Sequence, residues 1–184
     1  SFYKNGNGVK QDYKVALGWF KLAADQGDDF SQYNIGLIYG HGRGVDQDHK
    51  EANKWFRLAA DQGHDRAQYA LGYSYIYSRG FKKNIEEGNK WLRLSANQGY
   101  ATAQYSLGLS YAKGRGVEQD HKEANKWFRL AADQGLANAQ NSLGWMYLKG
   151  KGVPKDRVEA VRWFQSAADQ GLPLAKKNLK RYGR

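Results

Sequence analysis

The chain has 184 residues and a net charge of +11, and 41% of its residues are hydrophobic. It contains no cysteine, which excludes disulfides and thiolate chemistry, and no apolar run approaches the roughly 18 residues that a transmembrane helix needs. Only two prolines and 26% charged residues suit a helical chain.

A fixed period of 36 residues runs through the chain. It is marked by Trp19, Trp55, Trp91, Trp127 and Trp163. The segment DHKEANKWFRLAADQG also occurs twice without one difference, at 48–63 and at 120–135. Such a period is typical of a repeat array, in which each unit buries its apolar face against its neighbours. We therefore expect one continuous domain over residues 1–184.

The period divides this domain into repeats. We expect a partial first repeat at 1–27, full repeats at 28–63, 64–99, 100–135 and 136–171, and a C-terminal cap helix at 172–184. Tyr3 stands in register with Tyr39, so the chain opens partway through a repeat. We expect residues before Ser1 to have been removed, which leaves an upstream signal or anchor open.

Each repeat is expected to begin with a helix, exemplified by residues 65–77. Its inner arc carries Ala67, Leu71, Ser74 and Tyr75. Gly72 and its equivalents are expected to let the paired helix approach closely. Turns of the form Gly-x-Gly-Val follow at 42–45, 114–117 and 150–153, where glycine supplies positive φ angles.

The second helix of the repeat is expected at 48–62. Asp48 and Glu51 resemble a capping box, in which the Asp side chain accepts an orphan amide and the Glu side chain reaches back. Gly63 closes the helix in the left-handed conformation. The buried stripe is expected to consist of Ala52, Trp55, Phe56 and Ala59. The solvated stripe is expected to consist of Lys50, Lys54, Arg57 and Asp61.

The third copy, at 64–99, differs most from the others. It carries Ser78, Phe81, Gly88 and Ser95 where other copies carry Gly, Val, Ala and Ala. A glycine within a helix costs about 0.5–1 kcal/mol relative to alanine. Two interpretations stay open: drift in one repeat, or a local bend used for binding.

The last expected helix, at 172–182, aligns with the first helix of a further repeat. Ala175 and Leu179 keep the inward register, whereas Lys176 and Lys180 stand where earlier copies have Gln and Gly. We expect a solubilising cap helix with its apolar residues packed inward and its lysines in water.

These motif positions resemble the Sel-one-like repeat family, a relative of the tetratricopeptide repeats. The copy at 100–135 shows the pattern as Ala103, Leu107-Gly108, Tyr111, Gly114-Arg115-Gly116-Val117, Asp120, Ala124, Trp127, Ala131-Ala132 and Gly135. The resemblance covers essentially the whole chain. It implies an all-α fold, a right-handed α-solenoid of about five 36-residue helix-turn-helix repeats.

The same resemblance implies a non-enzymatic adaptor. Similar repeats act in membrane-associated degradation, in bacterial signalling and host contact, and as immunity proteins that neutralise a secreted toxin. A bacterial protein is therefore expected, and its compartment stays open between periplasm, exterior and cytoplasm.

The resemblance further implies that the first helices line a concave groove, whose variable positions select a protein or peptide partner. The candidate positions are Asn34, Leu37, His41, Arg66, Tyr73, Tyr77, Leu109, Lys113, Trp145 and Lys149. Trp145 is the strongest single candidate, because it is the one tryptophan outside the 36-residue period. For Leu37 and Leu109 the alternative is that they fill the core between repeats.

No pattern in the sequence predicts catalysis, a metal or a cofactor. The Gly-x-Gly turns lack the Lys-Ser/Thr pair of a phosphate-binding loop. No pair of the four histidines has ligand spacing on one helical face, and His49 and His121 are repeat equivalents that should lie far apart. We therefore expect no enzyme, no catalytic residue, no cofactor and no small-molecule substrate.

The positive charge is unevenly distributed. Five of the eleven net charges lie in the last thirteen residues, at Lys176, Lys177, Lys180, Arg181 and Arg184. A second hypothesis is therefore an electrostatic binder of nucleic acid or of an anionic membrane through this basic end. A nucleic-acid track would spread along the array, so this pattern disfavours nucleic acid and leaves membrane contact open.

Overall fold

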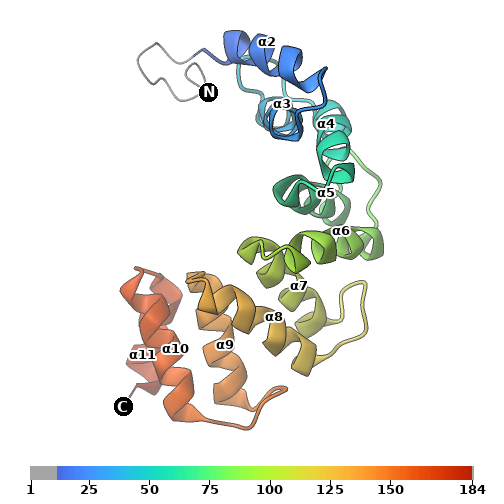
Figure 1. Cartoon of the computed structure of the whole chain (residues 1–184). Helices are drawn as coiled ribbons and strands as arrows, with labels where there is room; N and C mark the ends of the chain where they lie inside the picture. The colour runs from blue at the N-terminus through green and yellow to red at the C-terminus, as the bar shows by residue number, and fades with distance from the viewer. Residues whose placement is uncertain (1–11, 184) are drawn as a thin grey trace. The chain divides into compact units, whose positions relative to one another are not determined.

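The computed structural model describes residues 12–183, and within this range the chain forms ten α-helices and no strand (Figure 1). The helices are α2 (Tyr13–Ala24), α3 (Asp29–His41), α4 (His49–Asp61), α5 (Asp65–Ile76), α6 (Ile85–Asn97), α7 (Ala101–Lys113), α8 (His121–Asp133), α9 (Ala137–Lys149), α10 (Arg157–Asp169) and α11 (Pro173–Tyr182). The prediction of an all-α chain of helix-turn-helix repeats is confirmed for the described residues. The expectation about residues before Ser1 lies outside them, as does Tyr3.

The helices belong to two compact units, Ser1–Leu94 (unit 1) and Ser95–Arg184 (unit 2). The first helix of a repeat has an odd label and the second helix an even one. Unit 1 thus presents the first helices α3 and α5, and unit 2 presents α7, α9 and α11.

A phenylalanine packed on a glycine forms the centre of most helix pairs. Phe128 and Phe164 are at most 2% exposed. A Cβ atom placed on Gly108 or Gly144 would lie 2.7 Å from the corresponding ring. The expectation that glycine at this position permits close approach is therefore confirmed.

In the third copy, at 64–99, different residues make the contact between the two helices. Leu92 stands in place of the phenylalanine, and a Cβ on Gly72 would lie 2.8 Å from the carbonyl oxygen of Gly88. A Cβ on Gly88 would in turn lie 2.6 Å from Ile76. Gly88 thus permits a close backbone approach of α5 and α6, in which an added Cβ would clash.

The second helices begin as predicted, except for the role of the glutamate. Asp48 accepts the backbone amides of Lys50 (2.8 Å) and Glu51 (3.0 Å) through its side chain. The Glu51 side chain does not reach back, because the Asp48 amide already donates to the carbonyl of Tyr39 at 2.9 Å. Glu51 instead accepts from Lys54 and from the indole N–H of Trp55, at 2.7 and 3.0 Å.

The assignment of tryptophan to the buried stripe was wrong. Trp55, Trp91, Trp127 and Trp163 are only partly buried, and Trp19 is 63% exposed. The indole N–H groups of Trp91 and Trp163 bind the glutamate four residues earlier, as at Trp55. The phenylalanine that follows the tryptophan is the buried core residue in α4, α8 and α10.

The assignment of Arg57 to the solvated stripe was also wrong. Arg57 donates to the hydroxyl of Tyr75 at 2.9 Å, and its guanidinium lies 4.7 Å from the ring centre of Trp91. Its equivalent Arg129 donates to the Tyr147 hydroxyl and lies 5.4 Å from the ring centre of Trp163. The arginine therefore joins one second helix to both helices of the next repeat.

Buried amide side chains fix the register between repeats. Gln140 donates to the carbonyl of Ala132 at 3.2 Å and accepts from Gln170 at 2.8 Å, and Gln104 does the same with Ala96 and Gln134. Such directional bonds permit one register only, because a slip would leave buried amides unpaired.

Candidate functional site

Nine of the ten candidate residues lie on the first helices and Tyr77 caps the end of α5, but their exposure is unequal. The exposed ones are His41, Arg66, Tyr77, Lys113 and Lys149. The partly buried ones are Leu37, Tyr73, Leu109 and Trp145. Asn34 is 1% exposed and donates to the carbonyl of Phe30 at 2.7 Å, so its assignment to a partner-binding surface is corrected here.

Leu37 and Leu109 pack in the core between repeats, which was the alternative to a role in partner binding. Leu37 packs against the core that contains Phe56 and Leu71, and Leu109 packs against the core around Phe128. Both side chains contribute mainly to packing between repeats, and little of either is left for a partner.

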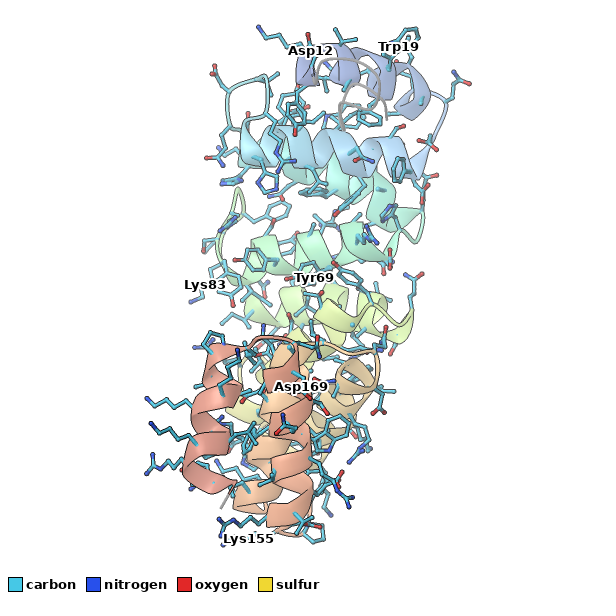
Figure 2. All side chains as sticks on the ribbon, turned by 90° about the vertical axis from the view of Figure 1, so that its left-hand side faces the viewer. Asp12, Trp19, Tyr69, Lys83, Lys155 and Asp169 are labelled. Atoms are coloured by element: carbon cyan, nitrogen blue, oxygen red, sulfur yellow. The ribbon has the colours of Figure 1, made fainter. Side chains whose placement is uncertain are left out.

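The candidates on α5 form a continuous aromatic surface. Tyr69, Tyr73 and Tyr77 (the tyrosine column) follow one another at four-residue spacing, with ring centres 6.2 and 4.4 Å apart. Tyr77 is 55% exposed. Figure 2 looks onto α3 and α5 of unit 1, with Tyr69 labelled on α5 and Lys83 in the turn that follows.

Basic groups of two turns and two helix ends border this column. Arg79 lies with its guanidinium 5.0 Å from the ring centre of Tyr73. Partial burial lowers the pKa of His41, and the positive charges of Arg43, Arg79 and His49 lower it further. Arg43, His49 and Arg79 are thus each near enough to His41 to act on it electrostatically, and these four residues are called the turn cluster.

In unit 2 the strongest candidate is largely a packing residue. The ring of Trp145 meets Phe164 at 6.0 Å and Tyr182 at 5.5 Å, both edge to face, and the Lys149 ammonium lies 5.6 Å from its centre. Trp145 therefore links α9 to α10 and α11. Lys113 and Lys149 remain the exposed candidates of this unit.

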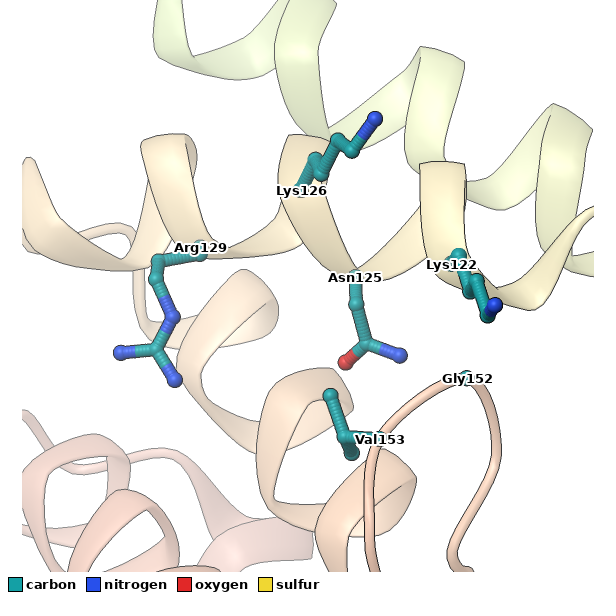
Figure 3. Close-up of a pocket in the computed structure, with 6 residues that line it drawn as sticks. All are labelled: Lys122, Asn125, Lys126, Arg129, Gly152 and Val153. Carbon is teal, nitrogen blue, oxygen red and sulfur yellow. The ribbon is translucent and has the colours of Figure 1, made fainter.

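A pocket of about 310 Å³ lies over the second copy of the repeated segment (Figure 3). It is lined by Lys122, Asn125, Lys126, Arg129, Gly152 and Val153. At the first copy, the position of Val153 is held by Phe81, whose ring stacks on Tyr75 at 4.2 Å. The smaller valine leaves room that a phenyl ring would occupy. No carboxylate, histidine or hydroxyl side chain lines the pocket, so it offers no acid–base pair.

The described residues show no assembled catalytic or metal centre. No group of three or more His, Cys, Asp or Glu residues within 12–183 could hold a metal ion. Ser110 and Lys113 have the Ser-x-x-Lys spacing of a known acyl-enzyme motif, but Ser110 is buried and its side chain has no histidine or lysine partner in the hydrogen bonds of residues 12–183. None of the described helices is long and apolar enough to cross a membrane.

Sequence reasoning missed two residues of the aromatic surface. Tyr69 was detectable, because it precedes Tyr73 by four residues on the same helix. Arg79 was not among the candidates, and its place near the Tyr73 ring depends on how the turn after α5 packs on α4, where Asn53 donates to the Arg79 carbonyl. That fold of the turn has no signature in the sequence.

The comparisons with known proteins agree with this architecture. The Sel1 repeat model matches residues 1–28, 29–64, 65–100, 101–136 and 137–172. No curated protein sequence matches the chain. A protective antigen of uropathogenic Escherichia coli with an SLR fold is 37% identical, with a TM-score of 0.93 over 97% of this chain and 38% of the antigen chain. A Sel1 repeat protein from Oxalobacter formigenes is 39% identical, with a TM-score of 0.90 over 97% of this chain and 73% of its own.

A more distant neighbour supports the fold alone. Cysteine-rich protein B of Helicobacter pylori is 22% identical, with a TM-score of 0.58 over 72% of this chain and 96% of its own. The chain spans 38% of the length of the antigen, so the activity of such a longer protein does not transfer to it directly.

Proposed function

Because the chain belongs to the Sel1 repeat family, whose members generally act as protein–protein interaction scaffolds, we propose that it binds a protein partner through the first-helix face of unit 1. Proteins of this family are generally not enzymes. The similarity to the E. coli antigen favours a bacterial protein with a role in host contact. No structure of comparable similarity to this chain supports an immunity role.

The tyrosine column is the observation that carries this proposal. Tyrosine at a protein interface offers a large contact area and a hydroxyl at little conformational cost. Here the neighbouring rings pack beside one another in tilted arrangements, which reduces the further ordering that binding requires. The corresponding residues of unit 2 are lysines or are packed against other helices, which leaves unit 1 as the better candidate.

The electrostatic alternative rests on α11. Lys176, Lys177, Lys180 and Arg181 are all exposed, so the helix has a basic face. However, the repeat at 28–63 has six acidic and four cationic side chains, so the positive charge does not continue along the array. A protein partner that binds unit 1 therefore fits the distribution of charge along the array better than a polyanion does.

Site-specific photo-crosslinking tests the proposal. A benzophenone amino acid replaces Tyr77 on the first-helix face or Leu58 on α4, two apolar side chains of similar exposure, 55% and 49%. In cells that make the protein, we expect a discrete crosslinked partner from position 77 and none from position 58. Tyr73→Ala should reduce the yield at position 77 without changing the melting temperature. Crosslinks from position 58 alone would place the partner on the opposite face and refute the proposal.

A further inference from the structure

The tyrosine column and the turn cluster are one surface rather than two. The Arg79 guanidinium lies 5.0 Å from the ring centre of Tyr73, and the Tyr73 and Tyr77 ring centres lie 4.4 Å apart in a tilted arrangement. The Asn53 amide of α4, in the preceding repeat, donates to the Arg79 carbonyl at 2.6 Å, and the charge of Arg79 lowers the pKa of His41 at the end of α3. Aromatic rings and cations from two consecutive repeats therefore adjoin within unit 1.

The two arginines of this surface, Arg43 and Arg79, are not ion-paired within the described residues. The nearby Asp48 carboxylate is occupied as a helix cap by the amides of Lys50 and Glu51. Lys82 and Lys83, in the same turn as Arg79, are exposed and add further positive charge.

The backbone holds Arg79 in position. The buried amide of Asn53 donates to the carbonyl of Arg79 at 2.6 Å. The next residue, Gly80, has a φ of +74°, and a Cβ there would lie 2.6 Å from the carbonyl of His49. The turn is thus seated on the start of α4, which reduces the entropy lost when the arginine binds a ligand.

From these contacts we propose that unit 1 recognises an acidic segment of its protein partner, with a carboxylate on Arg79 and an adjacent apolar side chain on Tyr73 and Tyr77. This inference rests on the proposed function and adds the chemistry of the partner to it. Arginine suits the role because its planar guanidinium can bind a carboxylate with two hydrogen bonds. The tyrosines supply the apolar contact and exclude water around it.

Single-stranded RNA could use similar chemistry, since bases stack on tyrosine and phosphates bind arginine. The cluster is a local feature, however, because the repeat at 28–63 that contributes His41 and Arg43 is net acidic. A short acidic peptide needs only this local charge, whereas an RNA strand needs a positive track.

A display library of random 12-residue peptides, selected on the full chain, tests the inference. Enriched peptides are synthesised and their affinity is measured by fluorescence anisotropy against wild type, Arg79→Gln, Tyr73→Ala and Lys54→Gln. Lys54→Gln is the matched control, because it removes the same single charge from the second helix α4 of the same unit. We expect acidic peptides, about 10-fold weaker binding to Arg79→Gln, a similar loss for Tyr73→Ala, and no change for Lys54→Gln.

Two outcomes separate this inference from the proposed function. Neutral or basic peptides that need Tyr73 but not Arg79 would overturn the acidic partner and leave the binding face intact. Failure to obtain any peptide that needs Tyr73 would overturn both. A 12-nucleotide oligouridylate that displaced the peptide with the same dependence on Tyr73 and Arg79 would also overturn the inference, in favour of RNA.

Discussion

Arg129 and Lys126 stand three residues apart on α8 and carry the same charge, yet their surroundings differ. Lys126 is exposed and pairs with Glu123 one turn earlier. Arg129 is partly buried between two aromatic rings of the next repeat, those of Tyr147 and Trp163. An exposed ion pair contributes little to stability, whereas a stacked and hydrogen-bonded arginine contributes through packing as well as charge.

We therefore predict unequal effects of removing these two cations. Arg129→Ala should lower the free energy of unfolding by about 1–2 kcal/mol, because it removes a hydrogen bond and a cation–π contact. Lys126→Ala should change it by less than about 0.5 kcal/mol. Urea denaturation followed by circular dichroism measures both. Restoration of full stability by Arg129→Lys would show that charge alone matters, contrary to the geometry.

A second prediction contrasts Trp127 with Phe128. Phe128 is 2% exposed and lies directly over Gly108. Phe128→Ala should cost roughly 3–5 kcal/mol, because it leaves a cavity in the core. Trp127→Ala should cost less, about 1–2 kcal/mol, since part of the ring is already in water. The periodic tryptophan, which the sequence suggested as the core residue, is expected to be the more tolerant of the two positions in the same denaturation experiment.

At the scale of elements, each helix pair is set by how closely two helices approach. Gly108 of α7 is the point of contact with α8, where an added Cβ would lie 2.7 Å from the Phe128 ring. Gly18 of α2 is the natural comparison, because no atom of residues 12–183 lies within 4 Å of a Cβ placed there. One residue type thus has two roles in two helices, and only the structure distinguishes them.

We predict opposite signs for the two glycine-to-alanine substitutions. Gly108→Ala should destabilise by about 1–2 kcal/mol, because overpacking outweighs the gain in helix propensity. Gly18→Ala should stabilise by about 0.5–1 kcal/mol, because only the propensity changes. Melting temperatures of the two variants measure the difference. A stabilising Gly108→Ala would mean that the Phe128 ring can move aside, so that the close approach is not needed.

Much of this element structure could be predicted from the sequence, and the exceptions have a common cause. Helix ends, turn glycines and the glycine contact followed from local signals such as the Asp48 cap. The contacts of Arg57 did not, because Tyr75 and Trp91 belong to the next repeat, and the role of Glu51 did not, because the Asp48 amide donates to the Tyr39 carbonyl of the preceding helix. The candidate site was likewise predictable only in part. Helical spacing identified Tyr73 and Tyr77, whereas Trp145 is covered by Phe164 and Tyr182, contacts that only the packing of α9 against α10 and α11 reveals.

At the scale of the whole molecule, the question is whether the net charge of +11 serves binding or solubility. The largest concentration of this charge is on α11, whose inner side is apolar as expected. Ala175 is 0% exposed, and Leu179 packs against the last two core clusters. Asn178 adds a buried hydrogen bond to Asn141 at 2.8 Å. The outer face carries four cations, so this helix is held by apolar contacts and presents its charge to water.

Substitution of these four cations separates the two roles. With Lys176, Lys177, Lys180 and Arg181 all changed to Gln, we expect lower solubility and self-association at high concentration, because an array needs a well-solvated face to stop further stacking. Helicity should be retained, since the inner contacts of α11 are unchanged. Affinity for an acidic peptide bound to unit 1 should stay within about twofold of wild type, because α11 contributes no residue to the tyrosine column or the turn cluster. Sedimentation velocity and peptide anisotropy at 50 and 200 mM salt measure these quantities. A large loss of affinity in this variant, joined to a steep dependence of wild-type binding on salt, is the signature of phosphate contacts, and would move the functional surface from the tyrosine column to α11.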